Sequence, residues 1–365
     1  MDKRIRVGLI YQYSENWIGG TYYIQNLVQA LRSLPDELKP ELNVITSTEN
    51  EFQQINQLSY PYTKWTLPAK ENKLNIPQRI INKIYNRLNG YDLYYSDRGI
   101  NTASVDVLFP SYIGIANGVK KIYWIADLQE HALPQFFTKR ELGNRLQINK
   151  YIANSKDEVV FSSQNAMQMF SDIFPKATVK KHVIHFAVTH PSGYGDLNIN
   201  VLRDKFKLDK PYYFVPNQFW KHKNHLVVLK AIEKLRVEGI KNFLVVFTGK
   251  EHDYRNPAYT DEIKKYVADH KLEDNVRFLG FIDRKEQLRL MTGAIAVIQP
   301  SLFEGWSTVV EDAKAMGQYV IASNIPVHKE QLNENVSFFD PIDDTHLSSF
   351  MKEGIQNGFI KKPGH

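Results

Sequence analysis

Residues 299–317 hold the most specific set of side chains for binding chemistry, between a predicted strand and a predicted helix. The segment reads QPSLFEGWSTVVEDAKAMG. Glu304 precedes the helix, where Gly305 and Ser307 can present backbone N–H groups beside its carboxylate. A carboxylate next to backbone donors is suited to binding sugar hydroxyls that adjoin a phosphate.

The start of this helix carries two further carboxylates. Thr308 and Glu311 have the S/T-x-x-E spacing of a capping box, so the sequence gives Glu311 a structural role. Asp312, one turn inside the helix, is then expected to be free to meet a ligand.

A second segment, residues 217–225, is rich in basic side chains and opens another predicted helix. It reads NQFWKHKNH, so Lys221, His222 and Lys223 meet a helix N-terminus, where the helix dipole favours an anion. A phosphate group is therefore the expected ligand. A single pyrophosphate fits this short segment better than a nucleic acid does.

Two segments of the N-terminal half also follow predicted strands. Gly19 and Gly20 come after the first strand and open a helix, which would let a substrate approach the backbone, although the dinucleotide fingerprint GxGxxG is not met. Asp127, Gln129 and His131 follow a later strand, and three hydrogen-bonding side chains within five positions favour a ligand-binding loop. His131 could act as an acid or a base near neutral pH.

Composition excludes several classes of protein. The 365 residues are 43% hydrophobic and 24% charged, which is typical of globular proteins and excludes disordered or collagen-like chains. Cysteine is absent, which excludes disulfides and thiolate metal sites and favours a cytoplasmic location. The net charge of +6 suits a protein that works near anionic material, and no apolar run is long enough for a signal peptide or a membrane span.

Strands and helices alternate along the whole chain, which predicts an α/β fold with parallel sheets covered by helices. Strands are predicted at 5–11, 42–46, 93–96, 105–109, 121–125 and 158–162, and then at 212–216, 242–248, 276–279, 294–299 and 319–322. The stretch 189–200 has no periodicity and is the expected linker. We therefore expect two facing Rossmann-like, doubly wound domains, residues 1–190 and 191–345, with a ligand cleft between them.

Basic residues stand among apolar ones in another part of the N-terminal half, residues 64–83. Lys70, Lys73, Arg79 and Lys83 stand among the isoleucines, so the segment could form a basic amphipathic surface for peripheral contact with a membrane. The pattern favours the alternative, a solvated loop and helix face.

The segments described above resemble the family-4 retaining glycosyltransferases of the GT-B fold. The family pattern P-S-x-x-E-G-x-x-x-x-x-x-E-A-x-A-x-G is matched at Pro300, Ser301, Glu304, Gly305, Ala313, Ala315 and Gly317, with Asp312 in place of the second glutamate. The resemblance implies that Glu304 holds the donor hexose hydroxyls and that Asp312 or Glu311 holds the ribose. It also places the backbone of Ser307 and Thr308 against the diphosphate.

The same resemblance assigns roles to residues outside this motif. Gln218 and Lys223 occupy the positions of a phosphate clamp that is usually Arg and Lys, so Lys223 would neutralise the leaving diphosphate, with Lys221 or His222 compensating for Gln218. Gly249 would lie near the donor, Phe281 and Ile282 would line the base pocket, and Gly19 and Gly20 would lie under the donor phosphates. Asp127 and His131 match the acceptor-side loop, and His131 would orient the acceptor or a hydroxyl of the donor.

The implied activity is transfer of a sugar from a nucleotide-diphosphate sugar to a glycan or lipid-linked glycan, in surface polysaccharide synthesis at the inner face of the membrane. The resemblance implies no metal and no cofactor, and Asp343-Asp344 is expected to cap the last helix rather than bind a metal. That helix, within residues 346–365, would pack back on the N-domain. The alternatives are a nucleotide-sugar epimerase of the same fold, a phosphorylase with pyridoxal phosphate, and a glycan- or nucleic-acid-binding protein. Binding of nucleic acid is disfavoured, because carboxylates flank the basic loops.

Overall fold

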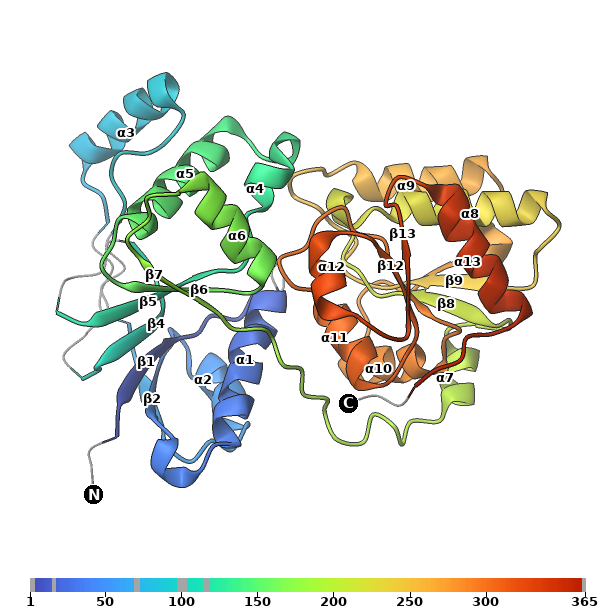
Figure 1. Cartoon of the computed structure of the whole chain (residues 1–365), viewed down its shortest axis with the longest axis horizontal. Coiled ribbons are helices and arrows are strands. Elements are labelled where there is room, and N and C mark those ends of the chain that lie inside the picture. Colours follow the sequence, from blue (N-terminus) through green and yellow to red (C-terminus); the bar gives the residue numbers. More distant parts are fainter. Residues whose placement is uncertain (1–3, 15–17, 69–72, 97–103, 114–117, 363–365) are drawn as a thin grey trace. The chain divides into compact units, whose positions relative to one another are not determined.

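The computed structural model describes residues 4–14, 18–68, 73–96, 104–113 and 118–362. The chain separates into two compact units, Met1–Thr189 and His190–His365 (Figure 1). The break falls at the start of the predicted linker, within one residue of the expected domain boundary.

The first unit is a parallel sheet in the order β3-β2-β1-β4-β5-β6-β7. Its strands are β1 (Arg6–Ile10), β2 (Glu41–Ile45), β3 (Thr63–Thr66), β4 (Val107–Ser111), β5 (Lys120–Ile125), β6 (Glu158–Phe161) and β7 (Lys180–Val183). Its helices are α1 (Ile18–Arg32), α2 (Glu49–Asn56), α3 (Ile76–Asn89), α4 (Gln129–Ala132), α5 (Lys139–Ala153) and α6 (Gln164–Ile173). Tyr123, Phe161 and Phe170 form part of the core where α5 and α6 cover the sheet.

The second unit is also a parallel sheet, in the order β10-β9-β8-β11-β12-β13. Its strands are β8 (Tyr212–Val215), β9 (Leu244–Phe247), β10 (Val276–Phe278), β11 (Val297–Gln299), β12 (Val320–Ser323) and β13 (Val336–Phe339). Its helices are α7 (Ile199–Lys205), α8 (His225–Val237), α9 (Tyr259–Asp269), α10 (Arg284–Gly293), α11 (Thr308–Ala315), α12 (Pro326–Gln331) and α13 (Asp344–Gln356). Both sheets therefore confirm the predicted doubly wound α/β architecture.

Strand order reverses once in each sheet, between β1 and β4 and between β8 and β11. At such a switch point the connections from neighbouring strands leave in opposite directions, which opens a crevice at the carboxyl ends of the strands. The segments after β8 and β11 are the two that the sequence singles out for phosphate and sugar binding.

The strand prediction at 93–96 is wrong, because this backbone has a side chain as its partner. The amide oxygen of Asn82 in α3 accepts hydrogen bonds from the N–H groups of Leu93 and Tyr94, and its Nδ2 donates to the Tyr94 carbonyl. The edge strands β3 and β7 are missed by the sequence prediction because they are short and carry lysines, as edge strands often do.

The C-terminal helix is anchored in the second unit, where α13 packs against α8. Leu347 and Met351 are fully buried in the core that both helices share. Asp343 caps α13 by accepting from the backbone N–H groups of Thr345 and His346, both at 2.9 Å, so the predicted capping role is confirmed. Residues 346–362 therefore continue the second domain and do not form a separate segment.

Candidate functional site

Lys223 and Glu304 meet at the switch point of the second sheet. Lys223 ends the short 3-10 turn Lys221–Lys223 after β8, and Glu304 lies in the segment between β11 and α11. The Lys223 Nζ donates to Glu304 Oε1 at 2.5 Å, with the two side chains only 17% and 8% exposed. Because β8 and β11 are neighbours in the sheet, two residues 81 positions apart form a buried ion pair.

The Glu304 carboxylate is held in place by neutral donors from its own strand and loop. Its Oε1 accepts from Ser301 Oγ at 2.6 Å and from Gln299 Nε2 at 2.9 Å. Gln299 is fixed in turn by Asn217 Nδ2, which donates to its Oε1 at 2.9 Å. Charge-assisted hydrogen bonds of this kind orient a carboxylate firmly, which is what recognition of a hydroxyl pair requires.

Three histidines around this pair are buried and neutral. Burial lowers the pKa of His328 to about 4 against the opposing charge of Glu304, and its Nδ1–H donates to the Ser323 carbonyl at 2.9 Å. Burial also lowers the pKa of His225 to about 3 and holds that of His222 well below its usual range. The expectation that His222 compensates for Gln218 is therefore wrong, because a buried neutral imidazole supplies no charge.

Arg255 is a basic residue near this site that sequence reasoning missed. The backbone N–H of Lys221 donates to Asp253 at 3.2 Å, which docks the segment of Arg255 on the basic turn. The Arg255 guanidinium lies over the Trp220 ring at 5.1 Å, and its charge, after burial and Lys223, helps to lower the pKa of His222. Its position between β9 and α9, about thirty residues after Lys223, shows no spacing signal in the sequence.

Gly249 allows three loops at the carboxyl ends of β8, β9 and β10 to pack together. Its φ is +144°, and a Cβ built there would lie 2.3 Å from the Asn217 carbonyl oxygen. Its N–H donates to the Gly280 carbonyl at 2.9 Å. Beyond Gly280, Phe281 is 65% exposed, whereas Ile282 packs against the core. Phe281 is thus available to a ligand at this edge.

The helix that follows Glu304 is capped one residue earlier than predicted. Ser307 is the N-cap of α11, since its Oγ accepts from the Val310 N–H at 3.3 Å, and Thr308 is the first helical residue. The capping box of Thr308 and Glu311 is therefore wrong. Glu311 instead accepts from Gln331 Nε2 at 3.0 Å. The Gln331 Nε2 also donates to the Ser307 carbonyl, and the Gln331 Oε1 accepts from the Ser307 N–H. The Ser307 N–H, which was expected to face a ligand, therefore already donates to the Gln331 amide oxygen at 3.1 Å.

Asp312 is already paired within the protein. Arg284 Nη2 donates to both carboxylate oxygens at 2.6 and 2.7 Å, His190 Nε2 lies 3.1 Å from Oδ1, and Asp312 is 1% exposed. The expectation that Asp312 is free to meet a ligand is therefore wrong. Ribose binding by Asp312 would require this pair to open, and Glu311 is the alternative.

In the first unit, Gly19 and Gly20 lie within the first turn of α1 rather than in the preceding loop. A Cβ added at Gly19 would meet no other described residue within 4 Å. Thr21 Oγ1 accepts from the Ser14 N–H at 3.1 Å and ties the chain after β1 to the helix. Their role under donor phosphates stays a prediction.

Asp127 and His131 lie at the carboxyl end of β5, as predicted, but residues 129–132 form the short helix α4 rather than a loop. Asp127 Oδ1 accepts from the Gln129 N–H at 3.1 Å, and His131 is exposed on α4. The neighbouring Glu130, which sequence reasoning missed, is buried against Arg145 and Asn149, and burial raises its pKa. Glu130 fixes α4 on α5 and so sets where His131 is presented.

The second unit is similar to a known protein family. Residues 200–361 match the model of the Glycosyl transferases group 1 family. The chain is 29% identical over 147 residues to the O-antigen chain mannosyltransferase RfbU of Salmonella typhimurium, a match covering 40% of this chain and 39% of that protein. It is 27% identical over 231 residues to the Alpha-1,3/1,6-mannosyltransferase ALG2 of Mus musculus, covering 59% and 53%. The chain thus spans about half or less of these relatives' lengths.

Solved structures share the fold over nearly the whole chain. A glycosyltransferase from Rickettsia africae has a TM-score of 0.66 at 16% identity, covering 96% of this chain and 88% of that one. HepE of Anabaena, in complex with UDP and glucose, has a TM-score of 0.66 at 15% identity, covering 97% and 90%. This likeness shows that the chain has the two parallel-sheet domains of the GT-B fold.

Proposed function

We propose that this protein is a retaining glycosyltransferase that transfers a sugar from a nucleotide-diphosphate sugar to a glycan or lipid-linked glycan acceptor. The observation that carries the proposal is the buried pair of Lys223 and Glu304 at the switch point of the second sheet. A lysine for a diphosphate and an oriented carboxylate for sugar hydroxyls, 2.5 Å apart, match the two halves of such a donor. The mannosyltransferase relatives support the same class of activity.

The proposed chemistry needs no cofactor and no metal, because the protein supplies the compensating charge. Lys223 and the N-terminus of α11 would stabilise the leaving diphosphate as charge develops on it. The bond between the sugar C1 and the phosphate oxygen breaks while the acceptor oxygen bonds to C1 from the same face. The acceptor proton passes to the departing phosphate oxygen, and His131 would orient the acceptor.

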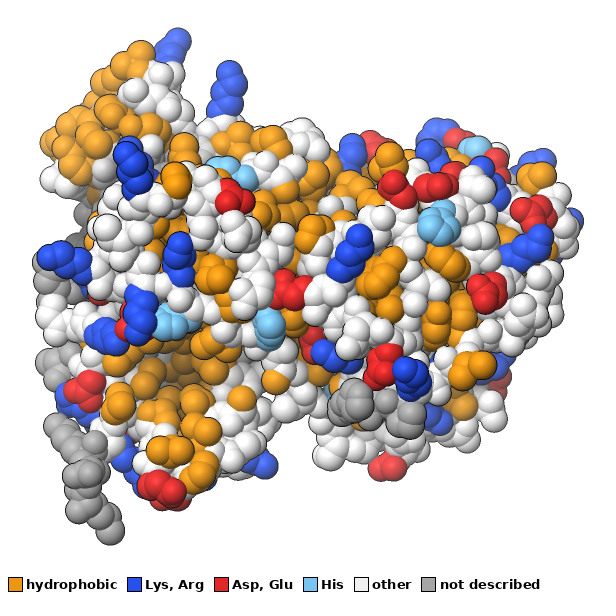
Figure 2. All heavy atoms as spheres, in the orientation of Figure 1, with side chains coloured by type: hydrophobic (Ala, Val, Ile, Leu, Met, Phe, Trp, Pro, Cys, Tyr) orange, Lys and Arg blue, Asp and Glu red, His pale blue; other side chains and the backbone are white. Residues whose placement is uncertain are grey.

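We further propose that the first unit contacts an anionic membrane through α3. Ile76, Ile80, Ile84 and Leu88 repeat every fourth residue and are 72%, 54%, 57% and 76% exposed. The sequence of α3, IPQRIINKIYNRLN, has three basic residues and no acidic one. Figure 2 shows the hydrophobic side chains gathered over this helix. An apolar stripe with only positive charge beside it is typical of a helix that lies in the membrane interface. Lys70 of the predicted basic surface lies outside the described residues.

Among the described residues, no helix is long and apolar enough to cross a membrane. The proposed contact is therefore peripheral, and it suits a lipid-linked acceptor in surface polysaccharide synthesis at the cytoplasmic face. The O-antigen function in the name of one relative supports this setting.

Transfer is tested by incubating the full chain with UDP-, GDP-, ADP- and dTDP-sugars and a panel of glycan and lipid-linked acceptors. We expect one donor to raise the melting temperature, since a ligand that binds only the native state stabilises it. The product should keep the anomeric configuration of the donor by NMR, and chelation with EDTA should leave the rate unchanged. An inverted product, or turnover of the donor into its epimer without an acceptor, would contradict the proposal.

The membrane contact is tested by cosedimentation with vesicles of phosphatidylcholine, with and without phosphatidylglycerol. The double variant Ile80→Ser/Ile84→Ser should bind anionic vesicles at least tenfold more weakly than the natural chain. Val237→Ser is the matched control, since Val237 is 84% exposed in the other unit. Equal binding of the double variant and the control would refute a role for α3.

A further inference from the structure

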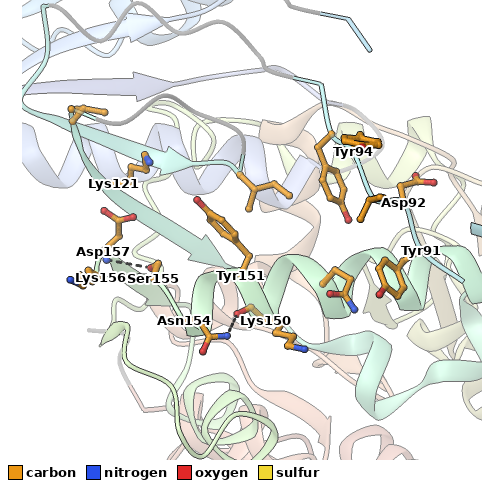
Figure 3. A pocket seen from close by; sticks show the side chains of 16 residues that line it. Tyr91, Asp92, Tyr94, Lys121, Lys150, Tyr151, Asn154, Ser155, Lys156 and Asp157 are labelled. Atoms are coloured by element: carbon orange, nitrogen blue, oxygen red, sulfur yellow. Dashed lines mark hydrogen bonds between the residues drawn. The ribbon is translucent and has the colours of Figure 1, made fainter. Parts of the chain in front are cut away.

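A cavity of about 1090 Å³ lies in the first unit, near the amino ends of β5 and β6 (Figure 3). Lys121 is the second residue of β5, and Ser155, Lys156 and Asp157 lead into β6, so the cavity adjoins the amino ends of these parallel strands. Asp127 follows the carboxyl end of β5. The cavity is therefore distinct from the acceptor-side segment of the same strand.

Lys121 is the unusual residue of this cavity. It lines the cavity and is only 4% exposed, and its side chain forms no hydrogen bond or ion pair with any residue in the described part of the chain. The stem of Lys121 is covered by the protein, so its ammonium has little freedom to turn away from the cavity that it lines. Such a group at the wall of an open cavity is well placed to receive an anion.

The other charges of the cavity leave the balance positive. Asp92 is already matched, since its Oδ2 accepts from Arg140 Nη2 at 2.8 Å and from Asn144 Nδ2 at 3.2 Å. Lys150 and Lys156 also line the cavity. Asp157 alone opposes three lysines, so an anionic group is favoured over a cation.

The rest of the wall is rich in tyrosine. Tyr91, Tyr94 and Tyr95 come from the segment that follows α3, and Tyr151 comes from α5. Figure 3 shows Lys121 at one end, Tyr91 and Tyr94 at the other, and Tyr151 between them. Tyrosine rings offer a flat apolar face with a hydroxyl at the edge, which matches the C–H face and hydroxyl rim of a sugar ring.

We propose that this cavity is a binding site for an anionic saccharide, a sugar that carries a phosphate or a carboxylate. The sugar ring packs against the tyrosines, and the anion binds the Lys121 ammonium. The volume lies just above the range typical of small-molecule sites and accommodates a mono- or disaccharide. Binding here does not depend on the proposed transfer reaction, so each proposal can fail without the other.

The test is calorimetric titration of the full chain with glucose 6-phosphate, glucuronic acid, glucose and inorganic phosphate. Binding of at least one of the two charged sugars should be at least tenfold tighter than binding of glucose or phosphate alone. Lys121→Met should weaken that binding at least tenfold, whereas Lys139→Met, an exposed lysine of the same unit outside the cavity, should change it less than twofold. The stronger of the two charged probes shows whether phosphate or carboxylate is preferred.

Folding is checked in the same variants by thermal melting. Lys121→Met removes an unpaired buried charge, so its melting temperature without ligand should equal or exceed that of the natural chain. Lys121→Arg should retain binding, and Tyr151→Leu should weaken the charged sugars and glucose alike. The proposal is overturned if neither charged sugar binds the natural chain more tightly than phosphate, or if Lys121→Met binds them unchanged.

Discussion

Removing Lys223 should destabilise the protein more than removing its partner Glu304, although both changes break the same ion pair. In Lys223→Met, the Glu304 carboxylate stays 8% exposed with only the neutral donors Gln299 and Ser301. In Glu304→Gln, those two donors keep an amide oxygen as acceptor, and the flexible Lys223 stem, 17% exposed, can turn toward water. The two variants therefore differ in which charge is left without a partner.

The magnitudes follow from this difference. Leaving one member of a buried pair uncompensated costs about 3 kcal/mol at the lower end of measured cases, which we expect for Lys223→Met because the pair is not fully enclosed. Losing a charge-assisted hydrogen bond while keeping the others satisfied costs roughly 1.5 kcal/mol, the expectation for Glu304→Gln. The double variant should be more stable than Lys223→Met alone, since it removes the stranded carboxylate.

Urea unfolding of the purified variants measures these free energies, and transfer assays should show activity falling in all three. The matched control is Lys265→Met, which breaks a pair with Asp269 of the same 2.5 Å length but with side chains 72% and 54% exposed. It should cost less than about 0.5 kcal/mol. If Lys265→Met were as costly as Lys223→Met, or Glu304→Gln the costlier of the pair, the reasoning from burial would be refuted.

Three further predictions concern the supports of the site. Gly249→Ala should lower the free energy of unfolding by more than about 2 kcal/mol, because the new Cβ would collide with backbone atoms at a residue with positive φ. Gly195→Ala is the control and should be nearly neutral, since no described atom lies within 4 Å of its Cβ position. Equal urea midpoints for the two variants would contradict this prediction. The pKa of His328 is about 4 in the folded protein and 6.5 in the unfolded chain, so the unfolded chain binds more protons between these pH values. The free energy of unfolding should therefore fall as the pH drops from about 6.5 to 4, by up to about 1.4 kcal/mol per pH unit. In a pH series of thermal melts, His328→Gln should show a weaker dependence of stability on pH. Arg284→Met should lower the free energy of unfolding measured in urea by about 3 kcal/mol, because it leaves the buried Asp312 carboxylate without its cationic partner. Adding Asp312→Asn to that variant should restore part of the lost stability. If it restores none, the ion pair does not explain the effect.

Much of the fold can be predicted from the sequence because the central strands are buried on both faces. The run Tyr212–Val215 is fully buried and reads as an uninterrupted apolar stretch, which identifies β8 without any other information. The edge strands β3 and β7 are only partly buried and contain lysines, so this signal is missing there. Among the edge strands of the two described sheets, β10 is predicted, whereas β3, β7 and β13 are missed.

The site could be predicted in its residue types but not in its pairing. The sequence places Lys223 and Glu304 after strands, yet only the order of strands shows that β8 and β11 adjoin. The residue type of His222 suggests a possible cation, but its burial lowers its pKa and keeps the imidazole neutral. No local sequence pattern reveals this burial. The spacing in the sequence predicts that the Asp312 carboxylate is free, but in the structure it forms an ion pair with Arg284, which lies 28 residues earlier.

The pairing of Lys223 with Glu304 also bears on product release. A free nucleotide has no sugar to occupy Glu304, so its terminal phosphate would meet a carboxylate 2.5 Å from the lysine that should hold it. Repulsion from Glu304 then offsets part of the attraction to Lys223. In the proposed reaction, an intact donor would place its hydroxyl groups on Glu304 and would escape this penalty. We therefore expect weak inhibition by the nucleotide product, and turnover that stays fast as that product accumulates.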